Sequence, residues 1–175
     1  MLAAKVVLGP EMVEIVDLPG IYDLHGFAED EQVVRKFLEN NPVDLVCIIL
    51  NATQLDHQLG LAVQFSQLGC NCVLMLNMID EAEKLGVQIK TKLLTEELKF
   101  PVATVSAKRG QGFPQAKEIL TQALQIAEPC DLAKIQNKLA QDDAVADTAE
   151  RIMTQSVILP VTLERETTER IDKIL

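Results

Sequence analysis

An amide and a carboxylate that follow an apolar run are the residues best suited to recognise a ligand. Asn77 and Asp80 stand in one short turn directly after the strand-like segment 72–76, with Met78 between them. Asp80 could accept two hydrogen bonds from the ring and exocyclic nitrogens of guanine, and adenine lacks that pair of donors. Asn77 would steady the neighbouring loops and touch the purine. The alternative is a plain helix N-terminus, with Asn77 as the cap and acidic residues in the first turn.

A second polar turn follows a later apolar run. Ser106, Ala107 and Lys108 come directly after segment 102–105. A backbone N–H of this turn could donate to the guanine carbonyl, while the aliphatic part of Lys108 packs on the base. The alternative is an ordinary exit from a strand into a loop. Ligands of open α/β sheets bind beyond the carboxyl ends of the strands, which is where both turns are predicted to lie.

A third motif, D-x-x-G, is formed by Asp17 and Gly20. Asp17 would reach Mg²⁺, directly or through water, since Mg²⁺ prefers carboxylates and keeps several waters. Gly20 would let the backbone approach a terminal phosphate, and the loop from Ile21 to Asp30 would act as a switch. Each motif alone is short enough to arise by chance. The three follow three different strands in the order found in GTP-binding domains, so together they favour a guanine-nucleotide site.

Length and charge restrict the classes of function. The chain has 175 residues, of which 48% are hydrophobic, and a formal net charge of −10. This length supports one good core and a small appendage. The acidic balance argues against a nucleic-acid partner, which would need basic clusters. We find no signal peptide and no apolar run near the ~20 residues that span a bilayer, and we expect a soluble chain.

Apolar runs and helical patterns alternate along most of the chain. We expect strands at 5–8, 12–16, 44–50, 72–76 and 102–105, and helices at 28–39, 56–68, 78–85, 91–98 and 113–127. The turn at Gly9 and Pro10 joins the first two strands into a hairpin. The unbroken apolar run in 44–50 predicts a strand covered on both faces, as in a parallel sheet. The fold class is therefore α/β, with right-handed βαβ connections.

The character of the sequence changes at Pro129. Beyond it, the residues are rich in Ala, Gln, Glu, Asp and Thr, and only Val157–Leu159 has the character of a strand. We predict two domains. The first comprises residues 1–127, and the second, residues 128–175, is a small all-α domain of two or three helices.

Three segments of the chain resemble a known family. They are 14–24, 76–82 and 105–112. They are similar to the cytosolic GTPase domain of the bacterial ferrous-iron transporter FeoB. Met78 in place of the more usual Lys, and Tyr22 after the D-x-x-G motif, are features of that group. The last segment, 169–175, resembles the one just before the family's first membrane helix.

The resemblance implies a P-loop-GTPase-like mixed sheet, with the N-terminal hairpin followed by parallel strands. It also implies that GTP or GDP and Mg²⁺ are the cofactors. The family couples GTP binding and slow hydrolysis to Fe²⁺ uptake. The chain would then lie in the cytoplasm, at the inner face of the bacterial membrane. The membrane domain of the parent transporter would be its partner, and an oligomer is left open.

The chain departs from the family pattern in two respects. None of its glycines is followed by Lys, so the phosphate loop G-x-x-x-x-G-K-[ST] is absent from the sequence. We expect base recognition to be retained, and phosphate binding and hydrolysis to be weak or absent, and we assign no catalytic residue. The family's first strand, which lies in the middle of the sheet between the strand before Asp17 and segment 45–50, is also absent. Its neighbours must pair directly or leave a gap, in a rearranged domain or a truncated product. A nucleotide-free interaction module is the alternative function.

Overall fold

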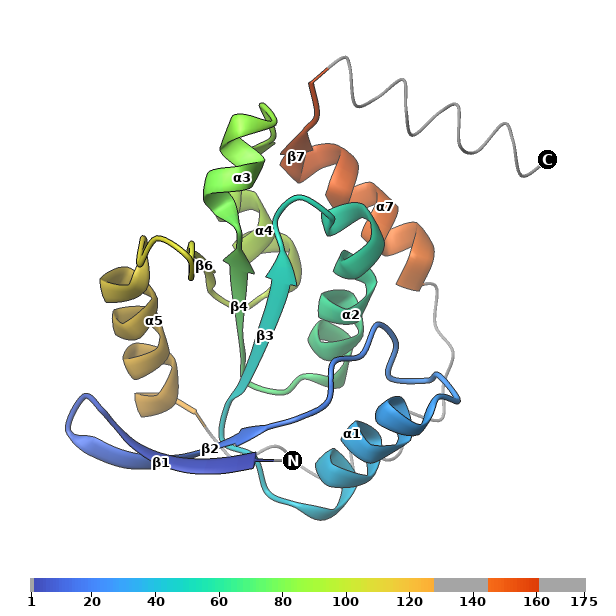
Figure 1. Cartoon of the computed structure of the whole chain (residues 1–175). Coiled ribbons are helices and arrows are strands. Elements are labelled where there is room, and N and C mark those ends of the chain that lie inside the picture. Colours follow the sequence, from blue (N-terminus) through green and yellow to red (C-terminus); the bar gives the residue numbers. More distant parts are fainter. Residues whose placement is uncertain (1, 128–144, 161–175) are drawn as a thin grey trace.

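The computed structural model describes residues 2–127 and 145–160, and an N-terminal hairpin is followed by alternating helices and strands (Figure 1). The strands are β1 (Leu2–Leu8), β2 (Glu11–Asp17), β3 (Val46–Asn51), β4 (Cys72–Asn77), β5 (Gln88–Ile89), β6 (Val102–Thr104) and β7 (Val157–Ile158). The helices are α1 (Glu29–Asn40), α2 (Leu55–Leu68), α3 (Ile79–Lys84), α4 (Thr91–Leu98), α5 (Phe113–Gln125) and α7 (Val145–Ser156). The elements predicted up to residue 127 are confirmed, with small shifts at their ends. No helix in this described part is long and apolar enough to cross a membrane.

The central sheet is parallel and consists of β3, β4 and β6, with β4 in the middle. Its register pairs Leu50 with Leu76 across β3 and β4, and Leu76 with Thr104 across β4 and β6. Parallel strands end at the same edge of a sheet, so the turns that leave β4 and β6 are neighbours. This edge therefore brings together two of the motifs found in the sequence.

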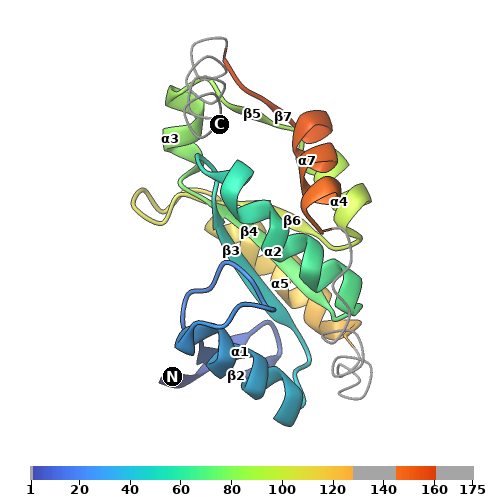
Figure 2. The same ribbon diagram turned by 90° about the vertical axis from the view of Figure 1, so that its right-hand side faces the viewer.

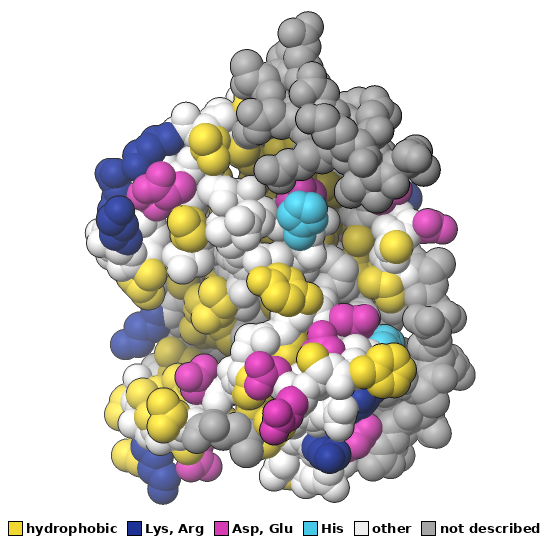
Figure 3. All heavy atoms as spheres, turned by 45° about the vertical axis from the view of Figure 1, so that its right-hand side comes forward, with side chains coloured by type: hydrophobic (Ala, Val, Ile, Leu, Met, Phe, Trp, Pro, Cys, Tyr) yellow, Lys and Arg dark blue, Asp and Glu magenta, His cyan; other side chains and the backbone are white. Residues whose placement is uncertain are grey.

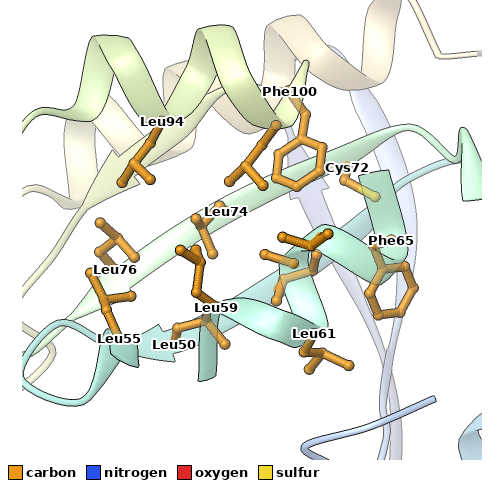
Figure 4. Packing of buried hydrophobic residues seen from close by; sticks show 14 of the residues in the cluster. Leu50, Leu55, Leu59, Leu61, Phe65, Cys72, Leu74, Leu76, Leu94 and Phe100 are labelled. Carbon is orange, nitrogen blue, oxygen red and sulfur yellow. The ribbon is translucent and has the colours of Figure 1, made fainter. Parts of the chain in front are cut away.

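Helices α2 and α4 cover one face of this sheet, and α5 covers the other (Figure 2). Leu55 and Leu59 of α2 and Leu94 of α4 are buried against Leu74 and Leu76 of β4 (Figure 4). Burying a leucine side chain contributes roughly 1.5–3 kcal/mol. The core thus forms around β4, the strand that ends at Asn77.

Strand β3 is covered on one face only, so the prediction of a strand covered on both faces is wrong. Ile48 and Leu50 are buried on the face that packs against α2, whereas Cys47 is exposed and Ile49 is 63% exposed. The second face of β3 is open because α5, the helix on that side of the sheet, packs against β4 and β6. The apolar run in the sequence signals apolar surface but does not specify what covers it.

The N-terminal hairpin forms a sheet of its own. Strands β1 and β2 pair from Leu2 opposite Asp17 to Leu8 opposite Glu11. Within the described residues, β2 and β3 belong to separate sheets, so the predicted gap is present and direct pairing is not. Apolar side chains of the hairpin are consequently exposed. Hydrophobic side chains gather at the lower left of the face in Figure 3, where the hairpin lies.

The described C-terminal segment packs onto the same core. Helix α7 contacts α2 and α4, and its Ile152 is 1% exposed. The strand-like character predicted for Val157–Leu159 is confirmed, because β7 pairs antiparallel with β5. Arg151 Nη2 lies 2.9 Å from Glu97 Oε2 of α4. The other helices predicted beyond residue 127 lie outside the described residues.

Candidate functional site

Two of the predicted motifs touch at the carboxyl edge of the central sheet. The Asn77 side-chain oxygen accepts hydrogen bonds from the backbone N–H of Met78, at 2.8 Å, and of Ala107, at 3.1 Å. The backbone N–H of Ile79 donates to the Val105 carbonyl at 3.2 Å. Asn77 therefore holds the turn after β4 against the turn after β6.

The turn after β4 has an unusual backbone. Met78 adopts φ +62°, a left-handed conformation that is uncommon for a residue with a side chain. Asn77 does not cap α3, because Met78 occupies the cap position and no side-chain hydrogen bond caps the helix. The acids expected in the first helical turn, Asp80 and Glu81, are present. The helix-cap alternative therefore explains the acidic residues but not Asn77, which serves instead as a link between the two turns.

Asp80 lies in a nearly closed position at this junction. Its side chain is 7% exposed, and Arg109 Nε lies 2.7 Å from its Oδ2 atom. The neighbouring Ser106 side chain is the largest influence that lowers the pKa of Asp80, followed by the positive charges of Arg109 and Lys84, while burial acts in the opposite direction. The carboxylate is therefore ionised at neutral pH and can only accept hydrogen bonds.

The turn after β6 is held in a tight conformation. Ser106 N–H donates to the Gln111 carbonyl at 3.0 Å, and Gln111 N–H donates back to the Ser106 carbonyl at 3.2 Å. Arg109 N–H also donates to the Ser106 carbonyl, at 3.1 Å. Ser106 is 1% exposed, whereas Ala107 and Lys108 are exposed. The turn thus offers its outer residues to a ligand while its base is fixed to the sheet.

Sequence reasoning missed Arg109 as a member of this cluster. Its position in the turn after β6 gave no signal of a partner in the turn after β4. The contact depends on the parallel register of β4 and β6, which places the two turns side by side. A basic residue in a polar loop is usually a solvated surface residue, and that is how the sequence alone represents it.

The D-x-x-G motif lies at a second place. Asp17 is the last residue of β2 and is exposed, and Gly20 is exposed as well. Gly20 and Tyr22 line a pocket of about 220 Å³ together with Leu50 of β3 and Leu61 of α2. An added Cβ atom at Gly20 would meet no atom within 4 Å. Across residues 2–127 and 145–160, no group of three or more His, Cys, Asp or Glu side chains is placed to hold a metal ion.

The loop after Gly20 is anchored to α2. Gln64 Oε1 accepts the backbone N–H of Leu24 at 2.9 Å, and Gln64 Nε2 donates to Asp23 Oδ1 at 2.6 Å. Leu24 is fully buried. Burial raises the pKa of Asp23, but the hydrogen bonds from Gln64 and from the His25 backbone outweigh it and leave the pKa lowered. Sequence reasoning also missed Gln64, a polar residue on a largely buried helix.

Comparisons of sequence identify relatives of this chain. The family model described as "Ferrous iron transport protein B" matches residues 3–120. The Fe(2+) transporter FeoB of Synechocystis sp. is 38% identical over 173 residues, which are 98% of this chain and 28% of that protein. FeoB of Campylobacter jejuni is 40% identical over 95 residues, which are 54% of this chain and 16% of that protein. The chain thus spans less than a third of the length of either relative.

Solved structures share the fold. The FeoB G-domain from Methanococcus jannaschii matches with a TM-score of 0.67 and 32% identity, over 70% of this chain and 77% of that one. The cytosolic domain of L. pneumophila FeoB gives 0.73 and 24%, over 89% and 83%. The cytosolic domain of the T. maritima iron transporter in its GMPPNP form gives 0.73 and 17%, over 89% and 85%. The predicted P-loop-GTPase-like α/β class is confirmed.

Proposed function

Because this chain belongs to the ferrous iron transport protein B family and corresponds to its N-terminal G domain, we propose that it recognises guanine nucleotides through the turns after β4 and β6. The observation that carries this proposal is that Asn77 and Asp80 both lie in the turn at the carboxyl edge of the sheet, beside the turn after β6. Asn77 fixes the two turns to each other, and Asp80 is an ionised carboxylate with lowered pKa. Met78, Ala107 and Lys108 are exposed around them.

Guanine is the base that this arrangement suits. Its ring N–H and exocyclic amino group form a donor pair that a carboxylate can accept, and Asp80 supplies that carboxylate. The turn at Ser106, Ala107 and Lys108 supplies backbone donors for the base carbonyl and an aliphatic stem to pack on the ring. Adenine offers no such donor pair, so ADP is expected to bind more weakly than GDP.

Phosphate binding is proposed to be weak in this chain. The sequence has no G-x-x-x-x-G-K-[ST] loop, and such a loop supplies backbone N–H donors and a Lys to the phosphates. Gly20 offers room for close backbone approach, because nothing occupies the space beside its Cα. Asp17 is the one residue we assign to Mg²⁺. A single exposed carboxylate suits an ion that is completed by water and nucleotide phosphates.

Membership of this family also supports a proposal about where the domain lies in the cell. We infer a cytoplasmic domain at the inner face of the bacterial membrane, where GTP binding and hydrolysis by the parent protein are coupled to Fe²⁺ uptake. The membrane domain of that transporter would be the partner, and an oligomer is left open. As it stands, the chain would be a very weak or inactive GTPase.

A binding experiment with matched nucleotides tests the recognition of guanine. Titration calorimetry of the 175-residue chain with GDP and with ADP should show a preference for GDP. Asp80→Ala should remove that preference, with a loss in GDP affinity of roughly tenfold or more, because a hydrogen-bonded pair to a charged group is lost. Glu83→Ala is the matched control, since it removes an exposed carboxylate from the same helix.

A specificity switch sharpens the same test. Xanthine carries a carbonyl where guanine carries its amino group, and an amide can donate to that carbonyl. Asp80→Asn should therefore shift the preference from GDP toward xanthosine diphosphate. Equal affinity of the unaltered chain for GDP and ADP would refute base recognition. Nanomolar GTP binding, or multiple turnover that Asp17→Ala abolishes, would refute the proposed weakness of the phosphate site.

A nucleotide-free interaction module is the second candidate function. The observation in its favour is the apolar surface of the hairpin, where Val7 is 65% exposed and Met12 is 72% exposed. A contiguous apolar surface of this kind is commonly covered by a partner. A GDP preference that is lost in Asp80→Ala would count against this alternative.

A further inference from the structure

The Arg109 side chain forms an ion pair with the Asp80 carboxylate, which we assign to base recognition. Its Nε atom lies 2.7 Å from Asp80 Oδ2, and the Asp80 side chain is only 7% exposed. A donor pair from guanine needs both oxygens of a carboxylate and an open approach to them. With the guanidinium 2.7 Å from Oδ2, one of those oxygens already faces a positive charge that stands in the way of the base.

The two partners of this ion pair differ in how easily they move. Asp80 sits in α3 and is held at the junction of two turns, whereas the Arg109 side chain is 55% exposed. The backbone around Arg109 is fixed by the hydrogen bonds of its turn, including that of Arg109 N–H to the Ser106 carbonyl. Only the side chain of Arg109 is therefore free to rotate, and water can solvate its charge when it leaves.

We propose that Arg109 competes with the guanine base for Asp80 and so lowers the affinity of this site for guanine nucleotides. The inference rests on the proposed function, because it takes Asp80 as the group that reads the base. If the arginine moves aside for the ligand, binding replaces this ion pair with hydrogen bonds from the base. The base must offset the loss of the ion pair, and the affinity of the site is set by the difference.

The exchange predicts a gain in affinity on removal of the arginine. Ion pairs with an exposed partner contribute little, and their loss corresponds to roughly a two- to fivefold change in an equilibrium constant. Arg109→Ala and Arg109→Gln should therefore each lower the Kd for GDP by about that factor. The second variant keeps much of the side-chain length without the charge. The gain should shrink at high salt, where the competing ion pair is already screened.

Lys84→Ala is the matched control. It removes a positive charge from α3 that acts on Asp80 without contacting it, because the Lys84 ammonium is paired at 3.0 Å with Glu81 Oε1. We expect its Kd for GDP to stay close to that of the unaltered chain.

A measurement without ligand accompanies the binding data. The carboxyl pKa of Asp80, followed by carbon NMR across a pH titration, should rise in Arg109→Gln because a neighbouring positive charge is lost.

The possible outcomes separate this inference from the proposed function. Tighter GDP binding by both Arg109 variants, with Lys84→Ala unchanged, supports competition. Equal or weaker GDP binding by both variants, while the unaltered chain prefers GDP over ADP, overturns the competition and leaves base recognition intact. If neither the unaltered chain nor any variant distinguishes GDP from ADP, base recognition itself fails, and the inference fails with it.

Discussion

Replacing Gln64 with Leu should release the loop that follows β2 from helix α2. Gln64 is itself buried, at 7% exposure, and its side chain makes hydrogen bonds to Leu24, Asp23 and His25 of this loop. Its side-chain oxygen accepts from Leu24 N–H at 2.9 Å, and its side-chain nitrogen donates to Asp23 at 2.6 Å. Leucine has a similar volume, so the substitution removes the hydrogen bonds without opening a large cavity.

The magnitude follows from what each partner loses. Leu24 is fully buried, so its N–H would be left without an acceptor, which costs about 1–3 kcal/mol. The side chain of Asp23 is 49% exposed, so water can replace the lost amide there. We expect Gln64→Leu to lower the free energy of unfolding by about 1–3 kcal/mol, nearly all of it from the stranded Leu24 N–H.

Two measurements separate a local release from a global loss of stability. Urea unfolding gives the change in free energy, and native-state hydrogen exchange should show the Leu24 amide exchanging roughly 5- to 150-fold faster. Gln122→Leu is the matched control, because Gln122 is exposed on α5 and bonds only across one helical turn to Glu118. An unchanged exchange rate for Leu24, or equal destabilisation by both variants, would refute the anchoring role of Gln64.

Three further perturbations probe the remainder of the fold. Asp23 and Glu97 have lower pKa values in the folded chain than their ordinary values of 3.8 and 4.5. Each carboxylate therefore stabilises the fold above its ordinary pKa, and this stabilisation is lost as the pH falls through the folded pKa. Urea midpoints should drop in that pH window, and less steeply in Glu97→Gln. Ile152→Ala should cost about 2–5 kcal/mol in urea unfolding, unlike Ile126→Ala at an exposed site. Gly112→Ala should lower the melting temperature, because its φ is +80° and an added Cβ would clash with backbone.

Much of the fold could be predicted because apolar runs and helical spacing of apolar residues indicate its strands and helices. The apolar run 72–76 predicted β4, and Gly69 predicted the end of α2, where it adopts a left-handed conformation. The same patterns predicted which motifs follow strands. They did not predict that β3 has one open face, because an apolar run records only that the side chains are apolar. Whether a helix covers the second face of β3 depends on where α5 lies across the sheet.

The sequence by itself determined the types of chemistry present: an amide and a carboxylate after one strand, a polar turn after another, and no phosphate loop. These features depend on residue identity and short spacing, so they are readable without coordinates. Only the tertiary structure decided which groups meet. The parallel register of β4 and β6 brings Arg109 onto Asp80, and the packing of α2 brings Gln64 onto Leu24. Both contacts join residues that are distant in the chain, because strand pairing and helix packing, rather than sequence spacing, determine such distances.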